Sequence, residues 1–205
     1  MNRKLIILLF LLHAVGVLGM LSPWQSLFLW LTPFHLMLSL GAILLAQEKW
    51  SLSLWRWIIL VGIAGYGVEV LGVKTGQVFG TYWYGATLGP HLFEVPPIIG
   101  VNWIMLSLAS AAVVSLISKN KWFSSIAAAA LMVGLDSIIE PVAIQLDFWS
   151  WEGNHIPLQN FIAWFVVALV FQLILHSITK GIKNIVAIWL FVFQLAFFTL
   201  LNLLL

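Results

Sequence analysis

Hydrophobic residues fill seven long stretches of this chain, each long enough to cross a bilayer as a helix, for which about 20 apolar residues are needed. The stretches are approximately 5–21, 25–46, 55–72, 97–118, 122–144, 158–178 and 184–205. They do not alternate apolar and polar positions as the strands of a membrane barrel do. The pattern predicts an all-α, polytopic membrane bundle of about seven transmembrane helices, with residues 1–205 forming a single integral membrane domain.

The first stretch has two interpretations. Arg3 and Lys4 precede an apolar run, as in a secretory signal peptide. The run continues to Leu21 without a clear small-x-small cleavage site, so we expect a retained helix.

Composition narrows the class of protein. The chain is 62% hydrophobic and 8% charged, which no soluble domain of this size matches. The net charge of +2 is too small for a nucleic-acid-binding surface, and the absence of cysteine excludes disulfides, thiolate metal sites and cysteine nucleophiles. We expect membrane lipid and a hydrophobic small molecule as partners, and no nucleic acid.

Basic residues indicate the orientation. With the N-terminus in the cytoplasm, only Lys74 among the nine basic residues falls in an outer loop. This bias follows the positive-inside rule, so we expect a multi-pass protein of the cell (inner) membrane with a cytoplasmic N-terminus. The inner residues are Arg3, Lys4, Lys49, Arg56, Lys119, Lys121, Lys180 and Lys183.

Acidic residues show the opposite distribution, because only Glu48 of the seven lies on the inner side. Glu69, Asp136 and Glu140 lie inside hydrophobic stretches, where a charged side chain costs roughly 2.5–3.5 kcal/mol on insertion scales. The orientation rule does not require this asymmetry. A functional site near the extracytoplasmic surface would explain it.

Polar residues of four stretches reach one level, about 5–10 Å below the outer surface, at a rise of 1.5 Å per residue. They are Glu69, Asn102, Asp136, Glu140, Asn160 and Trp164. Asp136 and Glu140 are four residues apart and therefore share a helix face. Pro141 follows them and favours a kink or a helix end at Glu140. A stripe of glycines at 62, 65, 72 and 76 flanks Glu69 and predicts close approach of another helix.

Aromatic residues alternate in the two longest outer loops, as Tyr82 and Tyr84 in one and Trp149 and Trp151 in the other. They form either an interfacial aromatic belt or a lid over the carboxyl groups, where the rings could bind a polyene and stabilise a cation. His13 and His35 are isolated in apolar segments, where we expect neighbours to satisfy them. Histidines show no metal-ligand spacing, so we expect no metal site.

Several blocks in order resemble a known family. They are Glu69-x-x-Gly72-x-x-x-Gly76, Phe79-Gly80-x-Tyr82-x-Tyr84, Leu88-Gly89-Pro90, Trp103, Asp136-x-x-x-Glu140-Pro141, Trp149-x-Trp151 and Pro157-x-x-Asn160-Phe161-x-x-Trp164. Over about residues 60–165 the chain is similar to the membrane carotenoid biosynthesis proteins, which include carotenoid 1,2-hydratases and bisanhydrobacterioruberin hydratase. Glu140 stands where this family often has aspartate, which leaves carboxyl chemistry intact.

The resemblance implies cofactor-independent hydration of the terminal isoprenoid double bond of an acyclic carotenoid, and possible association with other carotenoid-pathway enzymes. We expect Asp136 to donate the proton, Glu140 to orient or deprotonate water, and Glu69 to hold the second charge or the water; these roles could be permuted. The residues expected to bind the substrate or water are Tyr82, Trp83, Tyr84, Asn102, Trp103, Trp149, Trp151, His155, Asn160 and Trp164.

Two other classes remain open. A carotene cyclase would use the same acid and cation but exclude water. A carotenoid- or lipid-binding subunit, or a proton-coupled transporter, would catalyse no reaction. A transporter would favour polar residues through both leaflets and an inverted repeat, and the sequence has neither.

Overall fold

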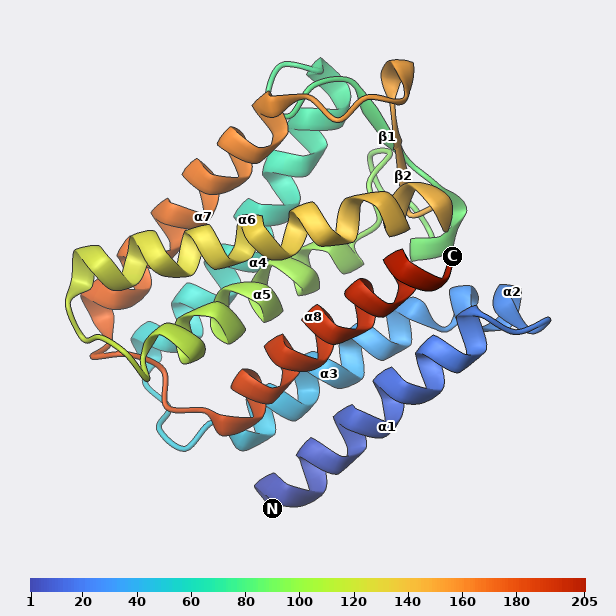
Figure 1. Ribbon diagram of the computed structural model, residues 1–205. Coiled ribbons are helices and arrows are strands. Elements are labelled where there is room, and N and C mark those ends of the chain that lie inside the picture. The colour runs from blue at the N-terminus through green and yellow to red at the C-terminus, as the bar shows by residue number, and fades with distance from the viewer.

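The computed structural model describes residues 1–205 and is a bundle of helices with one small sheet (Figure 1). The helices are α1 (Asn2–Met20), α2 (Gln25–Trp30), α3 (Thr32–Ala46), α4 (Leu52–Thr75), α5 (Ile98–Val114), α6 (Lys121–Gln145), α7 (Leu158–Ile178) and α8 (Ile185–Leu204). The strands are β1 (Tyr82–Tyr84) and β2 (Trp149–Trp151). Two short 3₁₀ turns, η1 (Ala86–Leu88) and η2 (Glu152–Asn154), follow the strands.

Five helices, α1, α4, α6, α7 and α8, are long and apolar enough to cross a membrane, so the chain is a multi-pass membrane protein. The apolar helices α3 and α5 are shorter, at 15 and 17 residues. The predicted stretch 25–46 is divided between α2 and α3. Pro33 lies in the first turn of α3, where its missing N–H costs nothing. The helical bundle is therefore as predicted, whereas the structure supports five spanning helices by length and composition.

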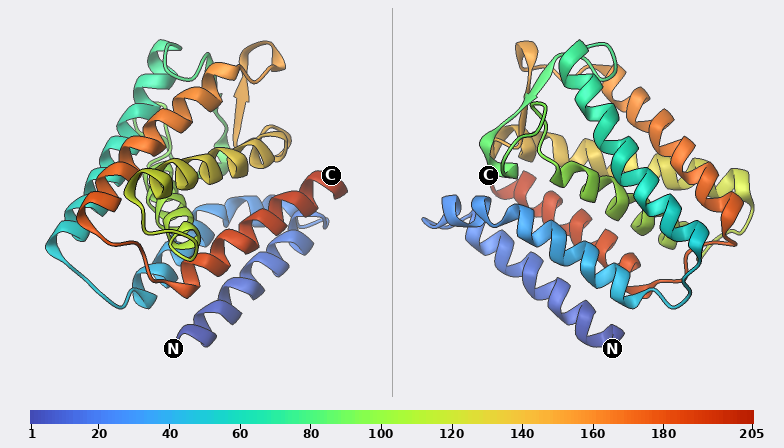
Figure 2. Two further views of the ribbon diagram at one scale, coloured as in Figure 1. Left: turned by 60° about the vertical axis from the view of Figure 1, so that its left-hand side comes forward. Right: turned by 180° about the vertical axis from the view of Figure 1, so that it is seen from behind.

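Helix α5 occupies the middle of the bundle, and 14 of its 17 residues are buried. It contacts α3 and α8 on one side and α4 and α6 on the other. Figure 2 shows α1, α3 and α8 as one group, separated by α5 from α4 and α7. One contiguous cluster of 43 buried hydrophobic residues joins the two groups.

The glycines of α4 permit the predicted close approach of α5. A Cβ atom on Gly65 would lie 2.6 Å from Cγ of Trp103, and one on Gly100 would lie 2.7 Å from the carbonyl oxygen of Gly62. Larger residues at these positions would separate the helices. The small-residue stripe therefore brings Trp103 of α5 against the helix that carries Glu69.

Helix α6 does not end at Glu140, so of the two alternatives predicted for that residue, a kink or a helix end, the helix end is wrong. The helix runs through Pro141 to Gln145. Proline removes one intrahelical donor, and the flanking packing tolerates that loss, because Glu140, Val142 and Ala143 are all buried. Both Asp136 and Glu140 consequently sit on one continuous helix.

Strands β1 and β2 connect the α4–α5 loop to the α6–α7 loop (Figure 1). They pair antiparallel, with Tyr82 opposite Trp151 and Tyr84 opposite Trp149. The all-α prediction omitted this sheet. Strands of three residues are too short for a periodic signal, and their stability here comes from pairing between distant segments.

Candidate active site

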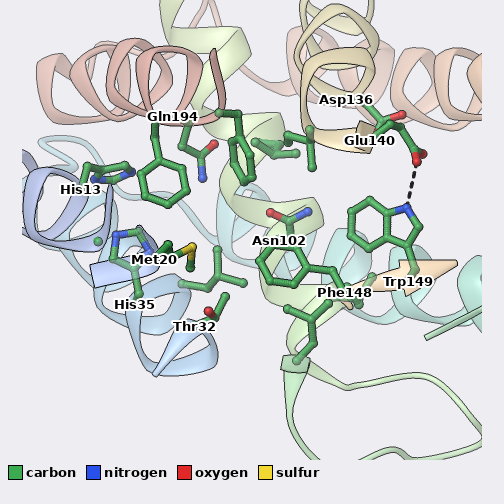
Figure 3. Close-up of a pocket in the computed structure, with 18 of the residues that line it drawn as sticks. His13, Met20, Thr32, His35, Asn102, Asp136, Glu140, Phe148, Trp149 and Gln194 are labelled. Atoms are coloured by element: carbon green, nitrogen blue, oxygen red, sulfur yellow. Dashed lines mark hydrogen bonds between the residues drawn. The ribbon is translucent and has the colours of Figure 1, made fainter. Parts of the chain in front are cut away.

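A cavity of about 350 Å³ lies between the two helix groups, and 21 of its 31 lining residues are hydrophobic. All three buried acids, Glu69, Asp136 and Glu140, line it. Figure 3 shows Asp136 and Glu140 at one side of the cavity, with Trp149 below them and Asn102 nearer the middle. An apolar cavity of this size with a few convergent polar groups is typical of a small-molecule site.

Glu69 projects from α4 and is surrounded by hydrogen-bond donors. Its Oε2 accepts hydrogen bonds from the hydroxyl groups of Tyr82 at 2.5 Å and Tyr84 at 2.9 Å. Its Oε1 accepts a bond from the indole N–H of Trp103 at 3.1 Å. Three donors on an acceptor-only group satisfy a buried carboxylate.

Glu140 has an equivalent arrangement built from the other strand. Its Oε2 accepts hydrogen bonds from the indole N–H groups of Trp149 and Trp151, both at 2.9 Å. Its Oε1 accepts a bond from the side-chain amide of Asn160 at 3.2 Å. This carboxyl group is therefore also held by three donors.

Asp136 differs from both glutamates. It is equally buried, at 2% exposure, but accepts only one hydrogen bond, from Asn160 at 3.4 Å. The same amide nitrogen contacts Glu140, so Asn160 joins the two acids of α6. Asp136 is thus the acid of the cluster with the fewest donors.

The small sheet delivers four of these donors. Successive side chains of a strand point to opposite faces, so Tyr82 and Tyr84 face inward on β1, as Trp149 and Trp151 do on β2. Burial, and then the nearby Glu69 carboxyl group, raises the pKa of Tyr82 and of Tyr84 above the ordinary tyrosine value. Both phenols are therefore neutral donors at every physiological pH.

Sequence comparison relates the chain to a family. The family described as "Carotenoid biosynthesis protein" matches residues 31–205. The chain belongs to this family. A bisanhydrobacterioruberin hydratase from Haloarcula japonica is 30% identical over 115 residues, which cover 52% of this chain and 39% of that protein. The chain thus aligns with about two fifths of that relative's length. No solved structure matches the chain.

The description of this family relates the chain to carotenoid biosynthesis. Most of the residues expected around the substrate meet at the cavity. Asn102 and Asn160 line it, and Trp164 lines it while stacking on Trp103 with ring centroids 4.0 Å apart. Trp103 is fully buried behind this stack and reaches Glu69.

Two of the expected substrate-binding residues lie elsewhere. Trp83 is 52% exposed, because its position in β1 turns it away from Tyr82 and Tyr84. His155 is exposed in the loop after η2 and does not line the cavity. Neither is part of the site that the structure forms.

The sequence did not reveal the far wall of the cavity, which α1, α2, α3 and α8 supply. This wall includes His13, Thr32, His35, Gln194 and Phe197. The rings of His13 and His35, considered isolated in the sequence, pack against each other with centroids 4.6 Å apart. Polar residues in three separate apolar segments were the available signal, but nothing in their spacing indicated that those segments meet.

Proposed function

We propose that this protein hydrates the terminal isoprenoid double bond of an acyclic carotenoid end group and produces a tertiary alcohol. The main observation in support of the proposal is that the three buried acids accept unequal numbers of hydrogen bonds. Two are held by three donors each, whereas Asp136, in the same cavity, has one long contact. A trisubstituted alkene is a weak base and needs such an acid.

Asp136 is the proposed proton donor. A carboxyl group that lies in an apolar cavity and lacks donors is suited to hold a proton, because the neutral acid needs less hydrogen bonding than the carboxylate. Its proton bonds to the less substituted alkene carbon. This leaves a tertiary cation on the substrate and a carboxylate on Asp136.

Glu140 and the aromatic walls handle the cation and the water. The carboxylate of Glu140 and the aromatic side chains of Trp149 and Tyr84 border the cavity and would stabilise positive charge there. The oxygen of a water molecule bonds to the tertiary carbon, and Glu140 accepts the proton that this oxygen loses. Return of that proton to Asp136, four residues away on the same helix face, completes the net addition of one water.

Glu69 has a positioning role in this scheme. Its three donors hold the carboxyl group in one orientation at the wall of the cavity, and through the two tyrosines it anchors β1. Asn102 also borders the cavity and is the proposed partner of the attacking water. No cofactor is needed by this chemistry.

Access of the substrate is proposed from the side. Leu8, Leu11 and Val15 on α1 line the cavity and are 42%, 51% and 51% exposed, so the cavity reaches the lipid-facing surface of the bundle there. The end group would occupy the cavity while the polyene remains in the bilayer. We propose a cell membrane location with the carboxyl cluster toward the extracytoplasmic side, on the strength of the basic residues at the opposite helix ends.

Product analysis tests the reaction. The chain would be expressed in a lycopene-accumulating bacterium, and the pigments separated by chromatography and weighed by mass spectrometry. Gain of one or two water masses is the expected result. An isomer of unchanged mass with shifted absorption would instead indicate cyclisation, and unchanged pigment that copurifies with the protein would indicate a binding protein.

A further inference from the structure

The side of the cavity opposite the carboxyl groups contains polar atoms without partners. They are Nε2 of His13, Nε2 of His35 and Oε1 of Gln194, all inaccessible and without a hydrogen-bond partner. Figure 3 shows the three side chains together with Met20 on the side away from Asp136 and Glu140. A buried polar atom without a partner costs about 1–3 kcal/mol, so three in one cavity point to a missing ligand group.

Hydrogen-bond geometry defines the chemistry of that group. Nδ1 of His13 lies 2.8 Å from the carbonyl oxygen of Leu9, and a carbonyl can only accept, so Nδ1 carries the hydrogen. Nε2 of the neutral ring then carries a lone pair and can only accept. Oε1 of Gln194 is likewise an acceptor, as every amide oxygen is, while the amide nitrogen has only the sulfur of Met105 at 4.0 Å. The site therefore presents two acceptors and requires an O–H or N–H donor.

His35 completes the site. Its ring lies against that of His13 at a 72° interplanar angle, so the two imidazoles meet edge to face. His35 can donate or accept through Nε2, because no other side-chain bond fixes its tautomer. An O–H group both donates and accepts, and matches this combination better than an N–H cation, for which no carboxylate stands on this side of the cavity.

We propose that His13, His35 and Gln194 form a hydroxyl-binding subsite at the second end of the cavity. The hydroxyl belongs either to the isoprenoid ligand, at some distance from its reacting double bond, or to an ordered water. This proposal rests on the proposed function in one respect: it assumes that the cavity binds an isoprenoid. It does not depend on the hydration reaction. His13 lies before residues 31–205, so this end of the cavity includes a helix outside the family match.

Binding of three short isoprenoids tests the subsite without turnover. Farnesol, its methyl ether and farnesene have one terminal isoprenoid end in common, but only farnesol can donate a hydrogen bond. Affinities would be measured by titration calorimetry in one detergent for wild type, His13→Leu and Gln194→Leu. Comparing each variant with wild type cancels the partitioning of each ligand into micelles.

His176→Leu is the matched control. Nδ1 of His176 also bonds a carbonyl four residues earlier, that of Gln172 at 2.9 Å, and its Nε2 is also without a partner. It does not line the cavity. Gln194→Leu is the second cavity variant because misfolding is not expected from it: the amide that it removes makes only the 4.0 Å contact to the sulfur of Met105.

Farnesol is expected to lose about ten-fold in affinity in both cavity variants, the value of one good hydrogen bond, while the ether and farnesene lose little. An equal loss for all three ligands would assign the O–H group to ordered water. Unchanged affinities for all three, or the same changes in His176→Leu, would overturn the subsite. The experiment measures binding and not hydration. Its outcome can therefore be interpreted even if the proposed reaction proves wrong.

Discussion

Replacing Asp136 with asparagine separates the chemistry of the carboxyl cluster from its contribution to folding. Asparagine has nearly the same shape and keeps an oxygen that can accept from Asn160. The bond at risk is a single contact of 3.4 Å, weaker than an ordinary hydrogen bond, so its loss should cost less than about 1 kcal/mol of stability. The amide, however, has no acidic proton to give to an alkene.

The expected loss of activity is therefore large compared with the loss of stability. Removing a general acid typically reduces a rate by about 10²–10⁴-fold, equivalent to about 3–5 kcal/mol of activation free energy. Tertiary alcohol formed per amount of folded protein would be measured in membranes with lycopene. Melting temperature in detergent, followed by tryptophan fluorescence, reports folding in the same preparations.

Ser137→Ala is the matched control, because Ser137 is the next residue on α6, is exposed, and bonds only the carbonyl of Gly134. It should keep both activity and melting temperature. If Asp136→Asn formed alcohol at the wild-type rate while folded, Asp136 could not be the proton donor. If it lost folding together with activity, the inference that its single contact contributes little to stability would be wrong.

Three further predictions concern the stability of the fold. Gly65→Ala should lower stability by about 1–3 kcal/mol, because the new methyl group would collide with Trp103. Gly67→Ala is the control, because a methyl group there would meet no atom within 4 Å, and it should be neutral or stabilising by up to about 1 kcal/mol. Equal melting temperatures for the two glycine variants would contradict this packing. Trp151→Phe should cost about 1.5–3 kcal/mol by removing a donor from Glu140, whereas Trp83→Phe, on the outer face, should leave the melting temperature unchanged. The two inward-facing tyrosines of β1 have pKa values in the folded state above that of a free tyrosine. Their contribution to the free energy of unfolding is therefore complete below pH about 10. It is lost as the pH rises further, because the unfolded chain releases those protons first. Melting temperatures from pH 8 to 11 check this, and phenylalanine at both positions should flatten the profile.

The acid cluster was predictable because several independent patterns agreed on it. Helix rise placed Glu69, Asp136, Glu140 and Asn160 at one depth, and the structure joins the last three through a single amide. The alternation of Tyr82 with Tyr84 and of Trp149 with Trp151 left two interpretations open, an interfacial belt or a lid over the carboxyl groups, and in the structure these side chains donate hydrogen bonds to Glu69 and Glu140. These patterns depend only on local geometry along each helix or strand, which the sequence specifies.

The features that were missed depend on contacts between distant segments. The predicted stretch 25–46 is divided just before the proline in the first turn of α3, and a helix end at Glu140 was one of the two expected alternatives because Pro141 was given too much weight against tertiary packing. The pairing of β1 with β2 joins residues 65 to 69 positions apart in the sequence, with Tyr84 opposite Trp149 and Tyr82 opposite Trp151. The meeting of His13 and His35 likewise depends on how α1 packs on α3. None of these has a periodic signature in the chain.

The two-stranded sheet restricts how the loops of this protein can change in length. Because side chains alternate along a strand, a slip of one residue in β1 would turn Trp83 toward Glu69 and both tyrosines outward. A single inserted residue between Gly76 and Tyr82 could therefore remove two donors at once without touching any helix. Insertions after β1, between Gly85 and Pro97, would leave that alternation intact. Length variation in natural relatives and in engineered variants should accordingly accumulate after β1 and be rare before it.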